Sequence, residues 1–146
     1  MKILVINAGS SSLKFTAFNF SWLGKQEVLA SGQVECIGIP TAALIYTKAG
    51  KAKVKTEIPV SEDRIVSKKY INHTEALKVV CDKLLSKEDG VIANIHDILA
   101  IGHRVVHGGE KVTKPVIIDE AVKKVVVECT SLAPLHNPAK DRKSVV

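Results

Sequence analysis

Two β-like segments joined by a short turn open the chain. Residues Ile3–Ile6 form a continuous apolar run, which indicates a strand buried on both faces. Residues Leu13–Phe20 alternate apolar and polar side chains, which indicates a second strand. The connecting residues Asn7–Ser12 are rich in glycine and serine, as turns are. The pattern therefore predicts a β-hairpin.

Later segments extend this hairpin into a larger sheet. Asn72 and Glu75 have the spacing of a capping box, and apolar residues at helical spacing follow them, so a helix is predicted from this point. Asp119 is predicted to cap a second helix. Strands first, then alternating helix and strand, predict an α/β domain with a mixed sheet and packed helices. The further predicted strands are Glu27–Cys36, Ala43–Thr47, Ala52–Ile58, Ile98–Ile101 and a short one at Pro115–Ile118.

Length and composition are those of an ordinary soluble domain. The 146 residues fit one domain, and 46% hydrophobic with 25% charged residues exclude a disordered chain. No apolar run approaches the roughly 18 residues of a membrane-spanning helix. The N-terminus turns polar at Asn7, too early for a signal peptide. We therefore expect a cytoplasmic protein with no membrane partner.

The charge and the cysteines exclude two further classes of protein. The net charge is +6, but the lysines are spread out and aromatic residues make up only 4%, so no base-stacking platform is indicated and no nucleic-acid partner is expected. Cys36, Cys81 and Cys129 lie far apart without a CxxC pair, which argues against a disulfide framework or a zinc ribbon. Three reduced and mostly buried thiols are predicted.

The turn after the first strand is the first candidate site. Gly9 lets a phosphate approach the backbone closely, Ser10 and Ser12 add hydroxyl donors, and Lys14 adds positive charge. The Asn7 amide can reach a phosphate oxygen or a metal-bound water. The pattern is not the GxxxxGK[ST] of a P-loop. A hairpin turn that is merely polar is the alternative.

Two later loops carry further candidates. Arg104 follows an apolar strand in Gly102–Gly109 and can hold a carboxylate or phosphate with two hydrogen bonds. His103 and His107 are four residues apart, but the intervening valines and flanking glycines argue against a helical zinc site. His136 stands between two prolines and can donate to a developing negative charge. Structural loop histidines are the alternative.

Taken together, three ordered segments resemble the acetate kinase family. They are Val5–Phe15, Gly102–Gly109 and Leu132–Pro138. The resemblance covers residues 1–139, and between residues 20 and 95 it is one of general pattern only. It implies a ribonuclease H-like first domain of the sugar kinase, Hsp70 and actin type.

The resemblance also implies an activity and a role for each candidate residue. The family transfers a phosphoryl group reversibly from ATP to acetate, giving acetyl phosphate and ADP, with Mg²⁺. Asn7 would help bind Mg²⁺, and Arg104 would bind the acyl substrate and take part in catalysis. His136 would stabilise the phosphoryl group in transfer. The phosphates would be contacted by Gly9, Ser10, Ser12 and Lys14.

The family's members are much longer, so the resemblance implies an incomplete enzyme. We expect residues 1–139 to be the N-terminal domain, residues 140–146 to be a divergent tail, and the second, nucleotide-binding domain to be absent. The chain is then predicted to be inactive alone and to self-associate or pair with the missing domain. Two alternatives stay open: a propionate kinase fragment, and a non-catalytic remnant that binds a phosphorylated ligand.

Overall fold

The computed structural model describes residues 1–104 and 114–128. The chain divides into two compact units. The first comprises residues 1–7 and 11–103, and the second comprises residues 8–10 and 104–146. The sheet and its main helix belong to the first unit, apart from the last residue of one strand, Ala8.

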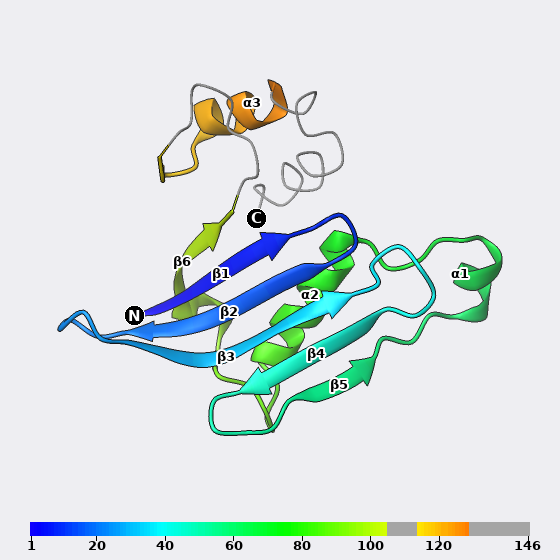
Figure 1. Ribbon diagram of the computed structural model, residues 1–146, viewed down its shortest axis with the longest axis horizontal. Helices are drawn as coiled ribbons and strands as arrows, with labels where there is room; N and C mark the ends of the chain where they lie inside the picture. Colours follow the sequence, from blue (N-terminus) through cyan, green and yellow to red (C-terminus); the bar gives the residue numbers. More distant parts are fainter. Residues whose placement is uncertain (105–113, 129–146) are drawn as a thin grey trace. The chain divides into compact units, whose positions relative to one another are not determined.

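The described residues form one mixed six-stranded sheet (Figure 1). Its spatial order is β5-β4-β3-β2-β1-β6, and β6 runs parallel to β1 while β3 pairs antiparallel with both β2 and β4. β1 and β2 run in opposite directions in Figure 1, as the hairpin prediction requires. The strands are β1 (Lys2–Ala8), β2 (Leu13–Phe20), β3 (Gln26–Glu35), β4 (Ala43–Lys48), β5 (Val54–Glu57) and β6 (Ile98–His103).

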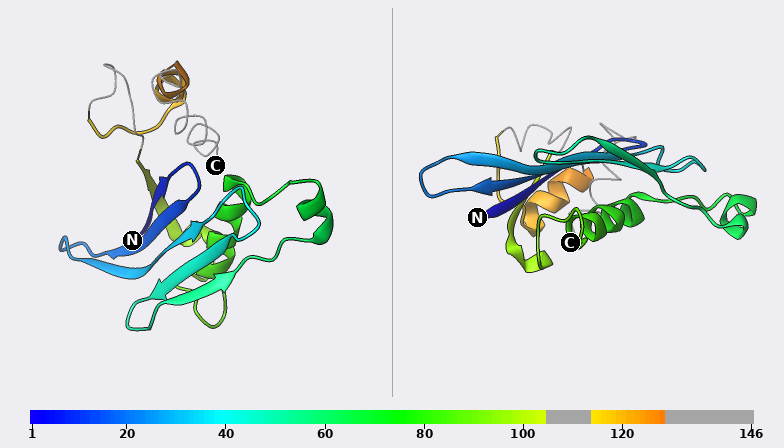
Figure 2. Two further views of the ribbon diagram at one scale, coloured as in Figure 1. Left: turned by 45° about the vertical axis from the view of Figure 1, so that its right-hand side comes forward. Right: turned by 90° about the horizontal axis from the view of Figure 1, so that it is seen from below.

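Helix α2 (His73–Leu84) covers one face of this sheet (Figure 2). Its predicted capping box is confirmed: the Glu75 backbone N–H donates to Asn72 Oδ1 at 3.0 Å, and the Asn72 N–H donates to Glu75 Oε2 at 2.9 Å. Ala76, Val80 and Leu84 recur every four residues and are fully buried. This stripe joins the core formed with the inward side chains of the sheet.

Alternation along the strands separates a core face from an open face. On β1, Leu4 and Ile6 are buried while Val5 between them is 40% exposed. On β2, Leu13 and Phe15 are buried while Lys14 is exposed. Because successive side chains point to opposite faces, the residues flanking the buried ones lie on the face away from α2.

Three shorter helices complete the described chain. They are α1 (Glu62–Val66), the 3-10 helix η1 (Ile95–Asp97) and α3 (Glu120–Glu128). The predicted cap of α3 is confirmed, since the Val122 N–H donates to Asp119 Oδ1 at 2.8 Å. The strand predicted at Pro115–Ile118 is wrong: these residues are exposed and pair with no strand among the described residues. An apolar run without a partner strand or a covering layer does not become a strand.

Two of the cysteines fall within the described residues. Cys36 and Cys81 are free thiols and partly buried, and burial raises the pKa of the Cys81 thiol. Cys129 lies outside the described residues. No helix in the described part of the chain is long and apolar enough to cross a membrane.

Candidate functional site

The candidate site begins where parallel strands end. Ile6 of β1 pairs with His103 of β6, so the two strands end at the same edge of the sheet. Asn7 follows Ile6 directly, and Arg104 is the next residue after His103 in the sequence. In open α/β sheets, ligands bind beyond the carboxyl ends of the strands. The first two candidate segments therefore start from strand ends that suit a ligand site.

The loop between β1 and β2 is anchored from one side. The Ile37 backbone N–H donates to the carbonyl oxygen of Ser11 at 2.9 Å, which ties the loop to the turn after β3. Ser10 is exposed, and Gly9 and Ser12 are partly exposed. The loop is thus held by its backbone while its serine hydroxyls stay accessible to a ligand.

The strand pleat places Asn7 and Lys14 on one face. Asn7 follows buried Ile6 on β1 and Lys14 precedes buried Phe15 on β2, so both are directed to the face away from α2. Lys14 is exposed and forms no ion pair with any described residue. An amide and an available cation on one surface are suited to an anion such as phosphate.

The described residues do not by themselves form a magnesium site. Within residues 1–104 and 114–128, no group of three or more His, Cys, Asp or Glu side chains is close enough together to hold a metal ion. Asn7 offers a single neutral amide oxygen, whereas Mg²⁺ is usually held by carboxylates together with substrate phosphates. The assignment of Asn7 to a metal therefore stays a prediction.

The remaining candidates are only partly described. Arg104 is exposed and makes no ion pair within the described ranges. His103 lies in β6 opposite Ile6. His107 and His136 lie outside the described residues, so neither the histidine pair nor the transition-state role of His136 is tested.

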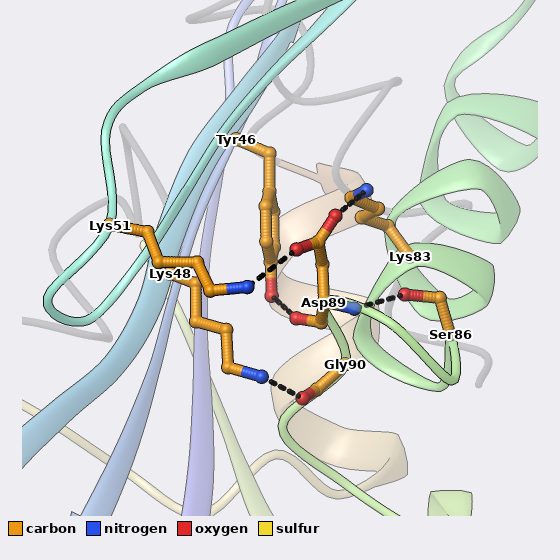
Figure 3. Close-up of polar contacts among 7 residues, drawn as sticks. All are labelled: Tyr46, Lys48, Lys51, Lys83, Ser86, Asp89 and Gly90. Atoms are coloured by element: carbon orange, nitrogen blue, oxygen red, sulfur yellow. Dashed lines mark hydrogen bonds and ion pairs between the residues drawn. The ribbon is translucent and has the colours of Figure 1, made fainter.

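A polar cluster distant in sequence from these motifs was not predicted (Figure 3). In this Asp89 cluster, the Asp89 carboxylate accepts from Lys83 Nζ at 2.8 Å and from Lys51 Nζ at 3.3 Å. The Tyr46 hydroxyl donates to the Asp89 carbonyl oxygen at 2.7 Å, and Lys48 Nζ donates to the Gly90 carbonyl oxygen at 3.0 Å. The cluster fastens the loop after α2 to β4, and its role is structural.

Two groups of the Asp89 cluster have displaced pKa values. Burial, and secondarily the negative charge of Asp89, raise the pKa of Tyr46 to about 12. Hydrogen bonds from Lys83 and Lys51 lower the pKa of the Asp89 carboxyl below its usual value. The folded state therefore favours a neutral Tyr46 and an ionised Asp89.

We expect stability at alkaline pH to depend on Tyr46. Between pH 10 and about 12 the unfolded chain loses its phenol proton while folded Tyr46 keeps it, so the free energy of unfolding falls across this window. Tyr46→Phe should flatten this decline. It should also lower stability at pH 7 by about 1 kcal/mol, because the hydrogen bond to the Asp89 carbonyl is lost. Urea unfolding at several pH values measures both effects, and Tyr70→Phe, at the other tyrosine, is the control that should keep the decline.

Nearly the whole chain matches one protein-family model. Residues 2–143 match the model of the acetokinase family. The chain belongs to the acetokinase family. It is 45% identical over 138 residues to the acetate kinase of Carboxydothermus hydrogenoformans and 47% identical over 138 residues to that of Clostridium acetobutylicum. Each alignment covers 94% of this chain but 31% of the relative.

Solved structures of family members agree with the fold. The crystal structure of Porphyromonas gingivalis acetate kinase matches with a TM-score of 0.81 at 40% identity, covering 99% of this chain and 33% of that one. A propionate kinase from Francisella tularensis matches with a TM-score of 0.75 at 29% identity, covering 97% and 32%. The predicted ribonuclease H-like fold is confirmed, and the chain spans about a third of the length of its relatives.

Proposed function

We propose that this chain is the N-terminal part of an acetate kinase. The complete enzyme would move the γ-phosphoryl group of ATP to acetate: an acetate oxygen forms a bond to phosphorus, the bond to the ADP oxygen breaks, and acetyl phosphate and ADP leave. The reaction is reversible. The relatives with 45% and 47% identity are named acetate kinases, which supports this activity over other phosphoryl transfers.

The observation that carries the proposal is the face that holds Asn7 and Lys14, beside the anchored loop that contains Ser12. Phosphoryl transfer depends mainly on positioning and on charge stabilisation, and this surface offers backbone, hydroxyl and ammonium donors to phosphate oxygens. In the proposed roles, Gly9 and Ser10 join these residues in binding phosphate. Arg104 orients the acetate carboxylate with its guanidinium, and His136 donates to the phosphoryl oxygens.

In the proposed function, Mg²⁺ would bind to the complete enzyme with its nucleotide. The described residues form no metal site alone, so the ion would be held largely by nucleotide phosphates and by residues outside them. Bound there, it would neutralise phosphate charge.

The chain alone should be inactive, because it spans 31% of these relatives and phosphoryl transfer needs a site that excludes water. We expect no ADP release from the purified 146-residue chain with Mg-ATP and acetate. A chimaera, in which residues 2–143 replace the matching third of Porphyromonas gingivalis acetate kinase, should turn over at about 1–100 per second.

A coupled assay for ADP release, with acetyl phosphate trapped as the hydroxamate, measures both proteins. A folded chimaera without activity would contradict the proposed function. Activity in the isolated chain would contradict only its expected incompleteness.

Propionate kinase is the second candidate function. The propionate kinase from Francisella tularensis shares the fold at 29% identity, below the 40% of the Porphyromonas acetate kinase. If residues outside this chain determine acid length, the chimaera would keep the acid preference of the Porphyromonas enzyme, whichever acid the natural enzyme uses. The ratio of kcat/KM for the two acids, compared with that of the unmodified relative, tests whether residues 2–143 contribute to the choice.

A further inference from the structure

Lys14, the cation proposed to bind phosphate, has a carboxylate on the neighbouring strand. Lys14 of β2 pairs directly with Gln33 of β3. Both lie beside the fully buried pair of Leu13 and Val34, so both are directed to the face away from α2. Glu35 lies two residues beyond Gln33 in the same strand and therefore on the same face. Diagonal neighbours of this kind lie about 7–8 Å apart, which long side chains can span.

The Glu35 carboxylate nevertheless has a different partner. It accepts a hydrogen bond from Lys55 Nζ at 2.5 Å and another from Gln33 Nε2 at 3.3 Å. The hydrogen bond from Lys55 is the main cause that lowers the pKa of the Glu35 carboxyl below its usual value. Lys14 makes no ion pair with any described residue. The carboxylate that could neutralise Lys14 is thus held by a lysine of β5.

The position of Lys55 suits it to hold Glu35 and not to share a ligand with Lys14. Residues that pair across the four neighbouring strands β2 to β5 form one row, namely Lys14, Gln33, Ile45 and Lys55 (Figure 1). Three strand spacings of about 4.8 Å place the backbones of β2 and β5 about 14 Å apart. Glu35 is on β3, next to β2, so its charge would act on an anion at Lys14 from a shorter distance than the charge of Lys55.

We propose that Lys55 is a positioning residue for phosphate binding: it holds the Glu35 carboxylate away from Lys14 and so keeps the Lys14 ammonium available to an anion. Without Lys55, the Glu35 carboxylate would have Lys14 as a cation within diagonal reach. Its uncompensated charge would also repel a phosphate bound there. The inference rests on the proposed function, since the availability of Lys14 matters only if a phosphate binds to it.

The ion pair between Lys55 and Glu35 should contribute little to the stability of the fold. The Lys55 side chain is 60% exposed, and exposed ion pairs are screened by solvent and order two long side chains. Lys55→Met should therefore leave the circular dichroism and the melting temperature of the chain unchanged. An effect of this variant on Lys14 or on phosphate would then not be due to unfolding.

The labelling rate of the Lys14 amine tests the inference in the isolated 146-residue chain. Acetic anhydride acylates free lysine amines, and mass spectrometry of the digested protein gives the rate at Lys14. The rate should fall about threefold or more in Lys55→Met, because pairing with Glu35 favours the charged, unreactive ammonium. It should return to the wild-type value in E35Q/K55M, which removes the carboxylate, and stay unchanged in Lys55→Arg, which keeps the pair. An unchanged rate in Lys55→Met would overturn the inference.

Lys51→Met is the matched control for the loss of one exposed positive charge. Lys51 is 57% exposed and also pairs with a carboxylate, that of Asp89. Its replacement changes the net charge by the same amount, but it should leave the labelling rate of Lys14 unchanged. A fall equal to that in Lys55→Met would show that net charge alone sets the rate, and it would overturn the inference.

The chimaera carrying residues 2–143 measures the consequence for phosphate. In Lys55→Met, kcat/KM for ATP should fall about threefold to tenfold, the effect of one uncompensated charge about 7–8 Å from the anion. It should recover in E35Q/K55M and stay unchanged in Lys51→Met. Failure of E35Q/K55M to recover would show that Lys55 itself contacts the substrate and would overturn the inference.

Two further outcomes separate this inference from the proposed function. Slower labelling of Lys14 together with an unchanged kcat/KM for ATP would show that no phosphate depends on Lys14, and it would overturn the inference. An inactive but folded chimaera without substitutions would remove the proposed function, whereas the labelling rates in the isolated chain would still decide whether Lys55 holds Glu35 away from Lys14.

Discussion

Gly32→Ala should destabilise the chain more than any other single methyl group added to the sheet. A Cβ at Gly32 would lie 2.2 Å from the Ile45 carbonyl oxygen and 2.8 Å from a ring carbon of Phe15. The first neighbour is backbone of the paired strand β4 and the second is a fully buried core side chain. The Ile45 carbonyl oxygen cannot move away without separating β3 from β4, so we expect a loss of about 3 kcal/mol in the free energy of unfolding.

Gly102→Ala is the matched control for this prediction. Gly102 also lies in a strand and has no positive φ, but its added Cβ would meet Val5 Cγ2 at an ordinary 3.6 Å. The free energy of unfolding should stay unchanged or rise by up to about 1 kcal/mol, since alanine restricts the unfolded chain. Urea unfolding followed by circular dichroism measures both variants. Equal stability of the two would show that β3 and β4 can separate without cost.

Arg104→Ala should abolish most of the activity of the chimaera. If the guanidinium binds the acetate carboxylate, its removal costs both substrate binding and orientation, and kcat/KM for acetate should fall about 100-fold or more. The KM for ATP should change by no more than about twofold. Lys53→Ala removes another exposed cation that forms no ion pair with a described residue, and it should leave both constants unchanged.

The test is decided by which kinetic constant Arg104→Ala changes, kcat/KM for acetate or the KM for ATP. A variant with normal kcat/KM for acetate would contradict the role of Arg104. An increase confined to the KM for ATP would move Arg104 to the nucleotide. Arg104→Lys should recover only part of the loss, because a single ammonium cannot reproduce two parallel hydrogen bonds to a carboxylate.

Sequence patterns were sufficient where local spacing carries the information. The β1–β2 hairpin, strand β3 and the capping box of Asn72 and Glu75 depend on neighbours within a few residues, and all were predicted correctly. Helix α1 was missed because it has five residues and buries none of them, so no apolar stripe marks it. The strand predicted at Pro115–Ile118 is wrong because strand-like composition does not provide a partner strand.

Sequence patterns did not predict the contacts between residues that are far apart along the chain. Lys48 and Lys51 bind Gly90 and Asp89, which lie about forty residues away along the chain. Alternation along a strand identifies the outward face but not the loop that lies against it. For the site, the pattern correctly indicated a turn after β1 with accessible donors. No local pattern identifies a ligand for this turn.

Strand β6 is an edge strand among the described residues, and Ile98–Gly102 carry no charge, which bears on how a longer protein of this family is synthesised. The 138 matched residues make up 31% of the relative, so the relative has roughly 300 further residues. Ribosomes add about 5–20 residues per second. The last of these residues would therefore be made about 15–60 s after the first third has emerged. During that interval an uncharged strand edge is open to other nascent chains. Synthesis of such a protein would then depend on chaperones that shield this edge, and slow translation would lengthen its exposure.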